Sequence, residues 1–180
     1  MTGKEFPTKA ELLTALRASR DEVLALVRAL PADALEQGRY ESGWNGRQIL
    51  AHIASIEWTY PRLLDIAREA GPAPRTEGNA PSRAMRGGND AYNERQVAKR
   101  AHLSVAELLA EFERNRAETI RAVEAADDGL FARTIRSAGG VTGPLGLVFH
   151  RVAVEHVLGH AHDLIRHGGP DMAPNPPSPA

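Results

Sequence analysis

Two histidines four residues apart, His156 and His160, are the residues of this chain best suited to chemistry. In a helix this spacing puts both imidazoles on one face, about 6 Å apart along the axis. Two imidazoles so placed can bind one metal ion, and His52, from another apolar segment, can supply a third ligand. Three protein ligands leave a coordination position open for water or substrate, which is the arrangement of a catalytic metal site.

The four remaining histidines are weaker candidates: His102, His150, His162 and His167. His162 points about 200° around the helix from His160, and His167 is expected to interact with the dipole at the end of its helix. The residues alone leave two interpretations of the three main histidines open. They form a metal site, or they are hydrogen-bonded histidines of the core.

Several charged residues near the three histidines are secondary candidates. Asp163 can accept a hydrogen bond from an imidazole, and Glu155 can act as a general base. Arg47 and Arg151 can bind the carboxylate or sugar of a small substrate. A surface role is the simpler interpretation of all four residues.

The composition excludes several functional classes. The chain has 180 residues and a formal net charge of −1, which argues against a nucleic-acid partner recognised through a basic surface. It has no cysteine, so disulfides, thiolate ligands and a cysteine nucleophile are excluded. No apolar run reaches the roughly 18 residues of a membrane span, and the N-terminus lacks the apolar region of a signal peptide. We therefore expect a cytoplasmic protein that binds neither nucleic acid nor membrane.

Long amphipathic segments must position the histidines. Capping boxes that start at Thr8 and Ser104 predict helices over 9–30 and 104–126. The charged face of the second of these helices, which includes Arg116, is predicted to be solvated.

The helix that bears His52 has an unusually complete start signal. Asn45 and Gln48 form a capping box, and the apolar pattern continues to about Ala67. Pro61 falls inside this pattern, and we expect it to kink the helix.

The helix that bears the histidine pair is predicted to start with Gly143 and Pro144 as N-cap and first residue, and to stop at Gly168. The segment 71–88 is rich in glycine, proline and polar residues and has no periodicity. Its length favours a lid or a crossover connection.

The predicted elements define the fold class. Four long helices, a short helix over 90–100 and an extended stretch at 131–135 predict an all-α protein, a four-helix bundle with additional short helices. We expect one domain over 1–169 and a flexible, proline-rich tail over 170–180.

Two sequence motifs resemble those of a known family. The stretch from Trp44 to Ile53, WNGRQILAHI, resembles the second-helix signature of the DinB-like superfamily. The stretch from His156 to Leu164, HVLGHAHDL, resembles its fourth-helix motif. The resemblance extends over 9–167. Members of the superfamily include bacillithiol S-transferases and the metal-binding N-terminal domain of mycothiol-dependent maleylpyruvate isomerase.

The resemblance implies a divalent metal held by His52, His156 and His160. In the family this metal is thought to activate a low-molecular-weight thiol for transfer or isomerisation. Zn²⁺ is the first choice, with Ni²⁺, Mn²⁺ or Fe²⁺ as alternatives, because imidazoles discriminate poorly among these ions. Isomerase-type members carry a second domain, for which 180 residues leave no room, and some use a carboxylate where this chain has His156. The histidine set is closer to the bacillithiol-transferase type.

Three functions follow from these observations. The first is a metal-dependent thiol S-transferase or thiol-dependent isomerase, with a small-molecule electrophile and a thiol of the mycothiol or bacillithiol type as partners. The second is a hydrolase in which the metal activates water. The third is a non-catalytic, stress-related metal-binding bundle that forms a homodimer. The segment 71–88 separates them, because a rim over the histidines favours a substrate site and a subunit contact favours the third function.

Overall fold

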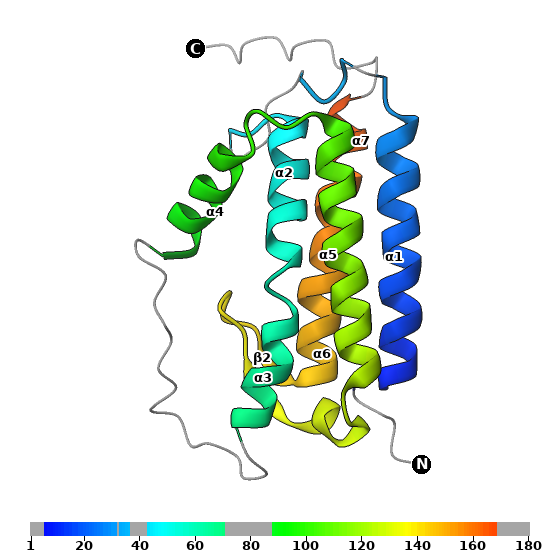
Figure 1. Cartoon of the computed structure of the whole chain (residues 1–180), viewed down its shortest axis with the longest axis vertical. Coiled ribbons are helices and arrows are strands. Elements are labelled where there is room, and N and C mark those ends of the chain that lie inside the picture. Colours follow the sequence, from blue (N-terminus) through cyan, green and yellow to red (C-terminus); the bar gives the residue numbers. More distant parts are fainter. Residues whose placement is uncertain (1–5, 32, 37–42, 71–87, 169–180) are drawn as a thin grey trace, which may run out of the picture.

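Four rows of helix lie side by side along the long axis of the molecule (Figure 1). They are α1 (Lys9–Ala29), α2 (Gly46–Glu57), α5 (Val105–Ala125) and a continuous run of α6 (Leu145–His150), a π turn (Arg151–Glu155) and α7 (His156–Gly168). The computed structural model describes residues 6–31, 33–36, 43–70 and 88–168, with only the backbone for 166–168. The predicted all-α four-helix bundle is confirmed.

The core lies between the four rows, because each long helix places its apolar side chains on one face. The largest contributions of α1 are Leu12, Leu16, Val23, Leu24 and Val27, and those of α5 are Leu108, Leu109, Phe112, Ile120 and Val123. Burying one such side chain contributes about 1.5–3 kcal/mol. This packing fixes the distance between the helices that carry the histidines.

Capping boxes determine where three of the helices begin. All three predicted boxes are present, at Thr8 and Glu11, Asn45 and Gln48, and Ser104 and Glu107. In the second box, the Asn45 side chain accepts from the Gln48 amide and the Gln48 side chain accepts from the Asn45 amide, each at 2.9 Å. The start of α2 is therefore fixed two turns before His52.

The helix predicted from 45 to 67 is in fact two helices. The first, α2, ends at Glu57, and α3 (Pro61–Glu69) begins with Pro61 after a turn. Proline has no amide hydrogen, so it is accommodated better in the first turn of a helix than in its interior. The predicted kink was therefore wrong, and Pro61 starts a new helix instead.

The last helical run also differs from the prediction. Pro144 is the N-cap and Leu145 the first residue, so the helix begins one residue later than predicted. The π turn between α6 and α7 was not predicted. Before this run, two short strands replace the expected extended stretch, and β1 (Thr134–Arg136) pairs antiparallel with β2 (Thr142–Pro144).

Besides α3, two short helices of the described residues lie outside the four rows. The predicted short helix is α4 (Gly88–Lys99), which packs beside α2 (Figure 1), and a 3₁₀ helix spans Asp128–Ala132. The loop predicted over 71–88, except for its last residue, and the tail predicted over 170–180 lie outside the described residues. Within the described residues, no helix is both long and apolar enough to cross a membrane.

Candidate metal centre

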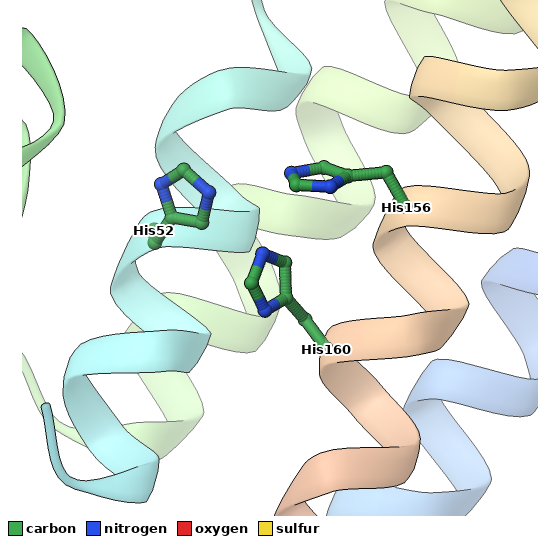
Figure 2. Close-up of side chains that lie close together, drawn as sticks. All are labelled: His52, His156 and His160. Atoms are coloured by element: carbon green, nitrogen blue, oxygen red, sulfur yellow. The ribbon is translucent and has the colours of Figure 1, made fainter. Parts of the chain in front are cut away.

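The three predicted ligands lie together between two neighbouring helices. His52 projects from the middle of α2, and His156 and His160 project from the first turns of α7 (Figure 2). One ring nitrogen from each histidine lies within 4.8 Å of the other two. The ring centroids are 5.8 Å apart for His52 and His156, 5.1 Å for His52 and His160, and 4.5 Å for the pair on α7.

This spacing is close to that of a metal site. A tetrahedral ion with bonds of about 2.0–2.1 Å to imidazole holds its ligand nitrogens about 3.4 Å apart. The three nitrogens lie within 4.8 Å of one another, so each pair would have to move closer by at most about 1.4 Å to reach that separation. The structure brings the predicted ligands together, and their binding of a metal stays a prediction.

The electrostatic environment keeps the three imidazoles neutral. Burial, with smaller contributions from His160 and His156, lowers the pKa of His52 to about 3. Burial and His156 lower the pKa of His160 to about 4, while Asp163 acts in the opposite direction. Burial also lowers the pKa of His156. Neutral imidazole is the form that binds metals, so all three residues are ready to act as ligands near neutral pH.

One buried atom of the cluster lacks a partner. His52 is 4% exposed, and its Nδ1 has no hydrogen-bond partner among the described residues. A buried polar atom without a partner is costly and calls for an explanation. A divalent metal fits the donor set, because three unprotonated imidazole nitrogens, each with a lone pair to donate, converge there.

The cluster is closed on one side and reaches solvent on another. The Trp44 ring centroid lies 5.2 Å from that of His52, and the indole Nε1 donates to Glu94 Oε1 of α4 at 2.8 Å. His156, by contrast, is exposed, and His160 is partly exposed. A small molecule can therefore approach the cluster from the side of His156.

Two other histidines of the α6–α7 run form their own pairs. His162 Nε2 lies 2.7 Å from Glu22 Oε1 on α1, and His150 Nδ1 lies 3.2 Å from Glu155 Oε1. Glu155 is therefore paired with His150, a histidine outside the three-histidine cluster. His102 is exposed near the start of α5.

Arg47, one of the secondary candidates, binds backbone carbonyls and a carboxylate outside the histidine cluster. Arg47 donates to the carbonyls of Ala101 and Leu103 and forms an ion pair with Glu36, so it connects the start of α2 to the segment before α5. Trp58 is 56% exposed at the end of α2.

Sequence analysis missed a buried ion pair close to the cluster. Arg116 and Glu57 are both fully buried, with Arg116 Nε 2.8 Å from Glu57 Oε1. The expectation that Arg116 lies on a solvated face was wrong. Its spacing carried a signal, because Arg116 lies four residues after Phe112 and four before Ile120, within the apolar stripe of α5.

Comparison with known proteins gives one match over most of the sequence. The model of the mycothiol maleylpyruvate isomerase N-terminal domain matches residues 8–165. No curated protein sequence matches the chain.

Several solved structures share the fold. The mycothiol-dependent maleylpyruvate isomerase superposes with a TM-score of 0.66 at 18% identity, over 88% of this chain and 61% of that one. The present chain therefore spans about three fifths of the isomerase. YfiT from Bacillus subtilis, a probable metal-dependent hydrolase with an unusual four-helix bundle topology, has a TM-score of 0.60 at 16% identity, over 92% of each chain. TT2238, a four-helix bundle protein, has a TM-score of 0.57 at 27% identity, over 87% of this chain and 98% of its own.

Proposed function

Because the chain belongs to the family of the mycothiol maleylpyruvate isomerase N-terminal domain, we propose that it is a divalent-metal-dependent enzyme that uses a low-molecular-weight thiol to transfer or isomerise a small electrophile. The observation that carries this proposal is the convergence of His52, His156 and His160, whose ring nitrogens lie within 4.8 Å of one another. We propose Zn²⁺ as the metal, because three neutral nitrogens with an open fourth position suit its tetrahedral geometry.

The chain's own residues have separate tasks in this proposal. The three imidazoles hold the ion between α2 and α7, and Trp44 covers the side near His52. When bound, the ion supplies Lewis acidity, which lowers the pKa of a thiol that reaches it. The thiol must come from outside the chain, because the sequence has no cysteine. His156 lies at the exposed edge, so thiol and electrophile would enter there.

The first test is metal content. The protein is purified without an affinity tag or chelator, and its metals are measured by elemental mass spectrometry beside a triple variant, His52→Ala, His156→Ala and His160→Ala. The matched control is His162→Ala, which removes a histidine of the same helix that pairs with Glu22. We expect close to one metal ion per chain in the wild type and the control, and none in the triple variant. Absence of metal after reconstitution with each candidate ion would contradict the proposal.

The second test concerns the reaction. Consumption of thiol in the presence of an electrophile should depend on the metal and disappear in His156→Ala. The alternative function is that of a metal-dependent hydrolase. It is favoured by the similarity to YfiT, a probable metal-dependent hydrolase, because this chain and YfiT each cover 92% of the other. Turnover of an ester or amide without added thiol would support the hydrolase and contradict the thiol-dependent function.

A further inference from the structure

The π turn immediately before His156 determines the direction in which the last two candidate ligands point. The amide of His156 donates to the carbonyl of Arg151, five residues earlier, where an α-helix would use the residue four earlier. The additional residue in this turn rotates everything after it by about 100° relative to an uninterrupted helix. His156 and His160 face His52 only in the presence of this turn.

Two side chains from other elements bind the backbone of the π turn. The Tyr60 hydroxyl, from the residue before α3, donates to the carbonyl of Val152 at 2.6 Å. The Arg116 guanidinium, from α5, donates through Nη2 to the carbonyl of Ala153 at 2.7 Å. A π turn disturbs the regular carbonyl pattern of a helix, so outside donors of this kind can stabilise it.

Arg116 also connects the π turn to the helix that bears His52. Its Nε lies 2.8 Å from Glu57 Oε1 and its Nη2 donates to Glu57 Oε2 at 2.9 Å. Glu57 is the last residue of α2, five residues after His52. On the opposite side, Nη1 donates to the carbonyl of Leu16 at 3.1 Å and to Ser19 Oγ at 2.8 Å, both on α1.

We propose that Tyr60, Glu57 and Arg116 are positioning residues that hold the π turn against α2, and so set the distance and orientation of His156 and His160 relative to His52. A buried ion pair contributes little net stability, because desolvation offsets most of its attraction. Its contacts with both ligand-bearing helices are better explained by placement of the ligands. The part of this inference that concerns metal rests on the proposed function.

The first experiment compares two variants that each lose one buried hydroxyl. Tyr60→Phe removes the hydrogen bond to the π turn. The matched control, Ser137→Ala, removes a buried hydroxyl that accepts from the Val141 amide at 3.1 Å, beside the β1–β2 hairpin. With Co²⁺ as the probe, we expect Tyr60→Phe to weaken binding about tenfold and to change the visible absorption of the bound ion. Ser137→Ala should bind within twofold of the wild type.

A second variant tests the ion pair. Glu57→Leu combined with Arg116→Met removes both charges together, which avoids leaving one charge buried alone. We expect this double variant to remain helical by circular dichroism and to lose about a hundredfold in Co²⁺ affinity.

A measurement on the metal-free protein separates this inference from the proposed function. We expect amide hydrogen exchange at 154–157 to be about tenfold faster in Tyr60→Phe than in the wild type, and unchanged in Ser137→Ala. Unchanged exchange in both Tyr60→Phe and the double variant would overturn the inference. If the wild type binds no Co²⁺, the proposed function fails, and the exchange rates still decide whether these residues hold the turn.

Discussion

His52 is the most deeply buried of the three candidate ligands, and its protonation is linked to folding. Burial lowers its pKa to about 3 in the folded protein, whereas the unfolded chain has a value near 6.5. Between these two values the unfolded chain binds a proton that the folded chain does not bind. The metal-free protein must therefore lose stability as the pH falls through this window.

We expect the free energy of unfolding of the metal-free protein to fall by about 1.4 kcal/mol per pH unit below pH 6.5 because of His52 alone. Urea unfolding in the presence of a chelator, between pH 4 and pH 7, measures this slope. His52→Gln should give a slope smaller by that amount. Equal slopes in the two proteins would show that His52 is already charged in the folded state.

Trp44 offers an optical signal for metal binding. Its ring lies 5.2 Å from that of His52, whereas the second tryptophan, Trp58, is exposed. Co²⁺ at the three histidines should therefore quench the fluorescence of Trp44 and leave that of Trp58 largely unchanged. In a titration of Trp44→Phe we expect the saturable quenching to disappear, and persistent quenching would place the ion elsewhere.

Two glycines of the last helical run should respond in opposite ways to the same substitution. A Cβ at Gly146 of α6 would lie 2.6 Å from the backbone oxygen of Pro7, whereas one at Gly159 of α7 would meet nothing within 4 Å. We expect Gly146→Ala to lower the free energy of unfolding by about 1–3 kcal/mol and Gly159→Ala to raise it by up to about 1 kcal/mol. Denaturant unfolding of both variants measures the two effects. A stabilising Gly146→Ala would mean that α6 does not pack closely on the chain before α1.

At the level of the elements, the sequence predicted helix starts better than helix interruptions. The box of Asn45 and Gln48 is a local pattern, so its residues alone indicated the start of α2. Pro61 is a local signal, but it was interpreted as a kink although it starts a new helix. The π turn was not predicted, because it depends on tertiary contacts. The π turn in particular is bound by Tyr60 and Arg116, which are distant in sequence, and the segment 151–155 has an ordinary helical pattern.

A metal at this site would connect two neighbouring helices that are far apart in sequence, α2 and α7. A ligand that binds only the folded state at about 100 times its Kd stabilises that state by about 2.7 kcal/mol. For a domain of this size we expect Zn²⁺ to raise the Tm by about 5–10 °C. Thermal unfolding with and without Zn²⁺ measures the shift. His162→Ala should show the same rise and His160→Ala none, and an equal rise in both would locate the ion outside the cluster.

At the level of the whole molecule, the sequence predicted the bundle and its membership of a superfamily, because apolar periodicity and the two histidine motifs are both explicit in the residues. It also indicated which three histidines come together. It did not indicate the buried pair of Arg116 and Glu57, because charged residues on a helix are usually solvated. Only the packing of four helices around that position shows why a guanidinium is buried there.

The placement of the three histidines has a consequence for biosynthesis. A nascent polypeptide that ends before His156 contains only His52 of the three candidate ligands, so it cannot chelate a metal ion through this set. Translation must proceed past His160, and α7 must leave the ribosomal exit tunnel, before the site can assemble. If the proposed metal binds there, a truncated or stalled product would be unable to retain it, and only chains synthesised past His160 would take up the metal.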